Sequence, residues 1–221
     1  MNLRRFYIAR GIGFLILLFL VFIWFAFFKT DKQSNQNKSV NNINVSTSEN
    51  STKDVVAEIV DQPIEPVDEF YSRISKKPFG IYITPQTSPV QPEKFTGYHT
   101  GVDVEYEDSG DEEVVIRAIS DGIVVRSAWV SGYGGMLAIL HKDYIVIYGH
   151  LNPATLPDIN KKVFKGDNIA ILGKGYSNET DGERKHLHFA IYTGPDINAR
   201  GYVATKTELG KWVDPVEFFK Q

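Results

Sequence analysis

Residues 185–192 read Lys-His-Leu-His-Phe-Ala-Ile-Tyr, and this stretch decides the fold of the chain. Its side chains alternate between two kinds, which is the period of a β-strand. His186 and His188 therefore share one face, while Leu187 and Phe189 share the other, which packs in a core. Neighbours on one face lie about 6.7 Å apart, which suits one imidazole on a metal ion and the other beside a substrate. A polar surface pair is the alternative, and His-x-His alone does not decide between them.

The residues before this strand continue the β pattern. Strands are predicted over 114–119, 123–130, 136–140, 144–151 and 168–172, where β-branched and apolar residues alternate with turn signals. The first two strands would form a hairpin around Ser120-Asp121-Gly122, and the next two a hairpin around His141-Lys142-Asp143. Several short strands joined by turns predict a mainly β fold with a largely antiparallel sheet.

Short helices are expected at the two ends of this β region. Pro66 begins a run with apolar residues at helical spacing, namely Val67, Phe70, Tyr71 and Ile74. We interpret this run as a packing helix without chemistry. Near the C-terminus, Asp214 can cap a short helix that has Pro215 at its first position.

Two further motifs carry side chains that can bind a metal. They are Tyr98-His99-Thr100-Gly101-Val102-Asp103 and Tyr148-Gly149-His150-Leu151. In an extended chain His99 and Asp103 would be about 13 Å apart, so the chain must bend, and Gly101 is the residue that can bend it. An ordinary turn and an ordinary strand end are the alternatives. His141, the fifth of the five histidines, is interpreted as structural.

The combination of residue types favours zinc. Neutral imidazole and carboxylate are the ligands of catalytic zinc, which takes three protein ligands and keeps one position open for water. Four of the five histidines and one aspartate fall in these three motifs.

The N-terminus predicts a membrane anchor. Residues 11–28 read GIGFLILLFLVFIWFAFF without a charge, and as a helix they would span about 27 Å, close to the core of a bilayer. Arg4, Arg5 and Arg10 precede them, so the N-terminus is expected in the cytoplasm and the rest outside the cell membrane. A cleaved signal peptide is the alternative, but the run is long and lacks a small-residue cleavage site.

Composition excludes several classes of protein. Residues 29–54 are almost wholly polar and predict a disordered linker. The whole chain has a net charge of −3, and because residues 1–28 carry three arginines and no acid, the remainder carries −6. An acidic soluble part argues against nucleic acid as a partner. The absence of cysteine excludes disulfides and thiolate zinc sites.

Taken together, the motifs HTGVD at 99–103, YGHL at 148–151 and HLHF at 186–189 resemble the lysostaphin-type, or LytM-like, zinc metallopeptidases. Those enzymes cut peptide bonds in bacterial cell-wall peptidoglycan. The stretches AISDGIV at 118–124 and KGDNIAILG at 165–173 support the resemblance, which covers about residues 95–192.

The resemblance implies a fold, a cofactor and a role for each motif. The fold is a lysostaphin-like antiparallel domain of the duplicated-hybrid-motif type. One zinc ion per chain would bind His99, Asp103 and His188, while His150 and His186 would be the catalytic imidazoles. Peptidoglycan is the implied partner. The expected organisation is a cytoplasmic N-terminus at 1–10, a transmembrane helix at 11–28, a linker at 29–54, a helical collar at 55–78 and a zinc peptidase domain at 79–221.

The chain departs from the family pattern around the site. The loop before the last motif reads GKGYSNETDGERK, longer and more charged than the family's usual loop, and a further stretch follows at 194–212. We interpret both as rims of a substrate groove. Six of the nine residues at 105–113 are acidic, and this run is interpreted as a solvated loop.

Two other functions compete with the peptidase. One is a non-catalytic or autoinhibited LytM-like module that activates another cell-wall hydrolase, with a protein regulator as its partner. The other is a scaffold that holds zinc for stability, which an open fourth position disfavours. All five expected site residues are present, and this favours the enzyme.

Overall fold

The computed structural model describes residues 62–221. The predicted membrane helix and linker lie outside the described residues, as does the start of the predicted collar. Within 62–221 no helix is long and apolar enough to cross a membrane. The described chain is mainly antiparallel β-structure with two four-residue α-helices, α1 at Lys206–Leu209 and α2 at Pro215–Phe218.

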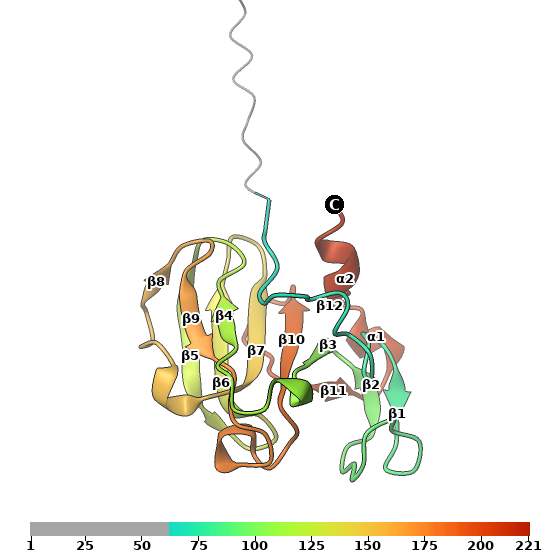
Figure 1. Cartoon of the computed structure of the whole chain (residues 1–221). Helices are drawn as coiled ribbons and strands as arrows, with labels where there is room; N and C mark the ends of the chain where they lie inside the picture. The colour runs from blue at the N-terminus through green and yellow to red at the C-terminus, as the bar shows by residue number, and fades with distance from the viewer. Residues whose placement is uncertain (1–61) are drawn as a thin grey trace, which may run out of the picture. The chain divides into compact units, whose positions relative to one another are not determined.

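The largest sheet has seven strands. Its order is β12-β10-β7-β6-β5-β8, with β3 also paired to β10. The bounds are β3 Val102–Glu105, β5 Gly122–Val130, β6 Gly134–Leu140, β7 Ile145–Leu151, β8 Lys162–Val163, β10 His186–Tyr192 and β12 Trp212–Val213. Figure 1 shows β10 between β7 and β3. The predicted hairpin at 136–151 is confirmed as β6 and β7.

Two smaller sheets flank the large one. The first has the order β1-β2-β11, with bounds Tyr82–Ile83, Gly97–His99 and Tyr202–Val203. The second pairs β4, Val115–Arg117, with β9, Asn168–Ile171. Three 3₁₀ turns lie at Glu107–Ser109, Pro153–Thr155 and Asn178–Thr180.

The strand β10 is buried along its whole length. Leu187, Phe189 and Ile191 belong to the main core, as the alternation predicts. On the opposite face, Ala190 and Tyr192 pack in a second apolar cluster with Met136. Because both faces are covered, the two histidines of this strand are buried and do not form a polar surface pair.

The predicted hairpin between 114–119 and 123–130 is wrong. β4 pairs with β9, and β5 pairs with β6 and β8. The turn that begins β9 binds the end of β4 instead: the Ala118 amide donates to the Asp167 carbonyl, and the Gly166 amide donates to the Ala118 carbonyl. The Asp121 carboxylate also accepts from the Lys165 amide. These hydrogen bonds hold the end of β4 beside β9, so β4 does not pair with β5.

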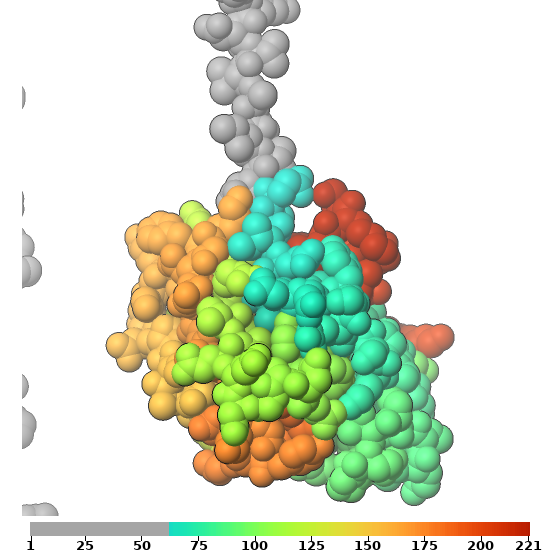
Figure 2. Space-filling view, viewed as in Figure 1, coloured from blue at the N-terminus to red at the C-terminus, as the bar shows by residue number. Residues whose placement is uncertain are grey.

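The predicted helix after Pro66 is also wrong. Residues 68–73 form turns, because Glu69 adopts a positive φ of 56° that a helix does not allow. The apolar positions still pack as expected, since Val67 and Phe70 are buried in the main core. In the space-filling view this first described segment lies directly on the domain (Figure 2). At the other end, α2 forms as predicted, and the Asp214 carboxylate accepts from the Val216 amide.

Candidate metal centre

Strand register places Asp103 next to His188. The two residues are directly opposite in the antiparallel pair of β3 and β10. On its other side His188 lies opposite Gly149 of β7, so the next residue, His150, reaches the same region. His150 has a positive φ of 62° and is the last residue but one of β7. Because β10 also carries His186, one sheet brings four of the five predicted site residues together.

His99 arrives from a different sheet through the predicted bend. It ends β2, and after two intervening residues β3 begins in the large sheet. Gly101 is needed here for space: a Cβ at this position would lie 2.3 Å from the Phe189 carbonyl oxygen and 2.8 Å from the Ala190 Cβ. The bend therefore packs directly against the backbone of β10. This close contact places the His99 ring next to Asp103 and His188.

Three ligand atoms converge in a nearly equilateral triangle. His99 Nε2 lies 3.1 Å from His188 Nδ1 and 3.2 Å from Asp103 Oδ1, and His188 Nδ1 lies 3.2 Å from Asp103 Oδ1. These three residues form a group able to hold a metal ion. In a tetrahedral zinc site with bonds near 2.05 Å, two ligand atoms are about 3.3 Å apart. The donor set and its spacing therefore fit zinc.

Neighbouring groups fix the orientation of two of these ligands. His99 Nδ1 lies 3.3 Å from the Pro78 carbonyl oxygen, so this nitrogen donates and Nε2 keeps its lone pair for a metal. Asp103 points Oδ1 to the triangle and Oδ2 to Arg184. Burial opposes the charge of Asp103, but His186 and His99 outweigh it and hold the pKa of this carboxyl well below its usual range.

The other two imidazoles lie against each other beside this group. The ring centroids of His150 and His186 are 4.1 Å apart, and His186 Nε2 is 3.5 Å from Asp103 Oδ2. His150 Nδ1 faces the Thr180 carbonyl at 3.3 Å, and His186 Nδ1 faces the Arg184 carbonyl at 2.9 Å. Each Nδ1 therefore carries the proton of the neutral ring, and each Nε2 is left as a base.

Burial keeps these rings neutral. It lowers the pKa of His150 to about 3 and the pKa of His186 well below the ordinary 6.5. The nearby His150 ring further lowers the pKa of His186, and the nearby His188 ring further lowers the pKa of His150. At neutral pH both rings are therefore uncharged, and each Nε2 carries a lone pair.

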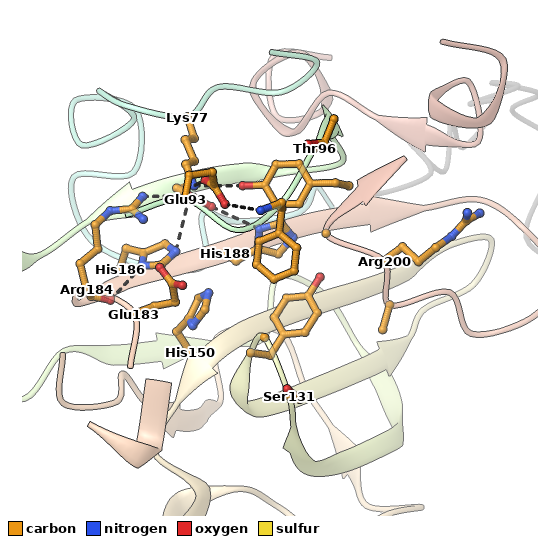
Figure 3. Close-up of a pocket in the computed structure, with 17 residues that line it drawn as sticks. Lys77, Glu93, Thr96, Ser131, His150, Glu183, Arg184, His186, His188 and Arg200 are labelled. Atoms are coloured by element: carbon orange, nitrogen blue, oxygen red, sulfur yellow. Dashed lines mark hydrogen bonds and ion pairs between the residues drawn. The ribbon is translucent and has the colours of Figure 1, made fainter. Parts of the chain in front are cut away.

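A cavity of about 320 Å³ opens onto the group. Asp103, His150, His186 and His188 line it. Figure 3 shows the three histidine rings, which come from β7 and β10. His99 is fully buried and does not line the cavity.

His141 lies apart from the site, at its hairpin. Its Nδ1 forms a hydrogen bond with the Asp121 carbonyl at 2.9 Å, and its ring stacks on Tyr144. The structural interpretation of His141 agrees with this position.

Sequence reasoning missed Arg184 and Glu105. Arg184 is 2% exposed and donates from Nη2 to Asp103 Oδ2 at 2.9 Å, while its Nε and Nη2 bind the Glu105 carboxylate at 2.8 and 2.6 Å. Glu105 was assigned to a solvated acidic run, but it is buried and paired. The sequence shows only that both segments are charged. It does not show that Arg184 pairs with Glu105, because the two residues are 79 positions apart.

Comparison with known protein families identifies the family that this part of the chain matches. Residues 97–202, which contain all five predicted site residues, match peptidase family M23. The chain carries an M23 peptidase domain. The resemblance inferred from the three motifs is therefore confirmed. No curated protein matches the chain significantly.

The solved structures similar to this chain share little sequence identity with it. The catalytic domain of lysostaphin from Staphylococcus simulans is 20% identical, with a TM-score of 0.49, and the match covers 71% of this chain and 100% of that one. A putative glycyl-glycine endopeptidase, LytM, from Ruminococcus gnavus is 20% identical, with a TM-score of 0.41 and coverage of 54% and 45%. A structure of the SpoIIQ–SpoIIIAH pore-forming complex is 18% identical, with a TM-score of 0.47 and coverage of 71% and 90%.

Proposed function

We propose that this M23 chain is a membrane-anchored zinc endopeptidase that hydrolyses peptide bonds in bacterial cell-wall peptidoglycan. The observation that carries the proposal is the triangle of His99 Nε2, Asp103 Oδ1 and His188 Nδ1, with sides of 3.1 to 3.2 Å. Beside it lie the imidazoles of His150 and His186, whose ring centroids are 4.1 Å apart. Membership of a peptidase family supports hydrolysis of peptide bonds.

Zinc on His99, Asp103 and His188 would supply Lewis-acid activation of a peptide carbonyl and of a water molecule. The protein supplies the proton transfers. Neutral His150 and His186 can take a proton from the attacking water and return one to the leaving amine. Their Nδ1 contacts to backbone carbonyls hold both rings in the tautomer that this task requires.

The proposed location of the enzyme rests on the N-terminal sequence. The uncharged run at 11–28 after three arginines supports a single-pass anchor with a cytoplasmic N-terminus. The M23 domain would then act outside the cell membrane, where peptidoglycan is found.

A regulatory module is the second candidate. The three metal-binding residues are at most 4% exposed, which favours a site that is covered until a partner or a substrate opens it. Such a module would bind zinc and cut nothing by itself.

One experiment separates these functions. The full chain is incubated with isolated peptidoglycan, with and without a zinc chelator, and the released fragments are read by mass spectrometry. The enzyme produces new peptide ends that disappear with the chelator. Tight zinc binding without any new ends would reject the enzyme and support the regulatory module.

A further inference from the structure

Most charged side chains that line the cavity are already paired. Lys77 Nζ lies 2.7 Å from Glu93 Oε2, and both side chains are at most 5% exposed. Arg184 is bound to Asp103 and Glu105. Arg200, at the other side of the cavity in Figure 3, lies 3.0 Å from Glu208.

Glu183 differs from these residues. It lines the cavity, its side chain is 20% exposed, and its carboxylate accepts no hydrogen bond from residues 62–221. Its nearest cation is Lys94, whose Nζ is 3.7 Å from Oε1 and whose side chain is 56% exposed. An ammonium bound to a carboxylate normally lies at about 2.8 Å. Burial raises the pKa of Glu183, so this carboxylate is partly desolvated and poorly compensated.

The position of Glu183 is suited to substrate. It lies in the same cavity as His150 and His186, and Figure 3 shows its carboxylate on their side of the cavity. The backbone around it is held, because its carbonyl accepts from the Tyr176 amide at 2.7 Å and from the Thr180 hydroxyl at 2.7 Å. A carboxylate on this held backbone, beside the proposed proton-transfer groups, can orient a charged peptide.

We propose that Glu183 binds a primary ammonium group of the peptide substrate, and that the Lys94 ammonium stands in this place before the substrate arrives. The inference rests on the proposed function. Lys94 comes from the segment before β2 and Glu183 from the loop before β10, so the ion pair joins two parts of the chain at the cavity. A substrate ammonium that reaches hydrogen-bond distance replaces a long, solvent-exposed contact with a short, sheltered one.

Three defined peptides test the inference with the zinc-loaded full chain. The first is Gly-Ala-Gly-Ala amide with a free terminal amine, the second is its N-acetyl form, and the third is N-acetyl-Lys-Ala-Gly-Ala amide. Calorimetry gives the Kd of each peptide, and mass spectrometry of the same samples reports cleavage. We expect at least one amine-bearing peptide to bind about tenfold more tightly than the acetylated one, and the better of the two tells which amine is recognised.

Two variants should act in opposite directions. Glu183→Gln abolishes the preference for the amine, whereas Lys94→Gln removes the competing ammonium and tightens binding of the amine peptide about threefold. The exposed residues Glu112 and Lys142 provide matched controls, Glu112→Gln and Lys142→Gln, which should change neither value.

Equal binding of all three peptides, no binding at all, or weaker binding in both variants would overturn the inference. Its failure is separable from failure of the proposed function. A preference for the amine without cleavage rejects only the peptidase, and cleavage without the preference rejects only the role of Glu183.

Discussion

Arg184 links the two halves of the candidate site at the scale of a single residue. Its guanidinium holds Asp103, a proposed zinc ligand, and its carbonyl orients His186, a proposed catalytic imidazole. The guanidinium also donates two hydrogen bonds to the Glu105 carboxylate, from Nε and from Nη2. A planar fork that binds two carboxylates at once is a property of arginine that lysine lacks.

Replacing Arg184 should weaken zinc binding. Arg184→Gln leaves Asp103 Oδ2 without its cation and lets the carboxylate rotate, so we expect a 10- to 100-fold loss of zinc affinity. Arg184→Lys should restore only part of it. Competition with a chromophoric chelator measures the affinity, and Arg126→Gln, at an exposed position, is the control. Unchanged affinity in Arg184→Gln would show that Asp103 needs no such support.

His150 predicts a pH dependence of stability in the chelator-treated chain. Its folded pKa of about 3 lies below the ordinary 6.5, so between these values the unfolded chain binds the extra proton. Stability is therefore full above pH 6.5 and falls as the pH drops toward 3, by about 1.4 kcal/mol per pH unit from this residue. Urea unfolding at several pH values should give a shallower curve for His150→Gln. Parallel curves for the two proteins would refute the prediction.

At the scale of the element, β10 organises the site. One neighbour, β3, supplies Asp103, and the other, β7, supplies His150, while β10 itself carries His186 and His188. The opposite face of β10 anchors the strand in the core through Leu187 and Phe189. The geometry of the ligands thus depends on how closely other segments approach this strand.

Gly101 offers a direct test of that close approach. A methyl group at this position would collide with the backbone of β10, so Gly101→Ala should destabilise the fold by about 1–3 kcal/mol and weaken zinc binding. Urea unfolding measures the first effect and chelator competition the second. Gly210→Ala is a matched control: its Cβ would meet no atom closer than 3.4 Å, and we expect little change. Equal stability of both variants would contradict the role assigned to Gly101.

Local pattern predicted some elements and failed for others. β10 was predicted from the alternation of its side chains. The hairpin of β6 and β7 was predicted from two apolar runs joined by turn residues. In both cases the signal lies within one short stretch of sequence. The segment after Pro66 has helical spacing, yet the left-handed backbone of Glu69 breaks the helix while the apolar residues still reach the core. The β4–β9 pair could not be predicted, because the turn at 165–167 competes for the end of β4 from about 50 residues away.

At the scale of the whole molecule, the sequence predicted which residues meet but not what supports them. Three short motifs identified the five residues that the structure brings around one cavity or directly behind it. Their supports, Arg184 and Glu105, lie outside those motifs and depend on tertiary packing. Charge composition placed Glu105 in a solvated loop, because a buried ion pair has the same composition as an exposed one.

The predicted anchor can be tested on the whole chain. With residues 11–28 in a bilayer, the protein should sediment with membranes and resist extraction by high salt or alkaline carbonate, and detergent should release it. A variant that lacks residues 1–28 should appear in the soluble fraction. Release of the full chain by carbonate alone would contradict a membrane-spanning segment.

The most direct test of the zinc peptidase measures zinc content and peptidoglycan cleavage in the same samples. Wild type should hold one zinc ion per chain and cut. His188→Ala should lose both zinc and cleavage, because it removes a ligand. His186→Ala should keep zinc and lose cleavage, and His141→Gln should keep both. Cleavage that survives in His186→Ala, or zinc that survives unchanged in His188→Ala, would contradict the roles assigned to the two histidines of β10.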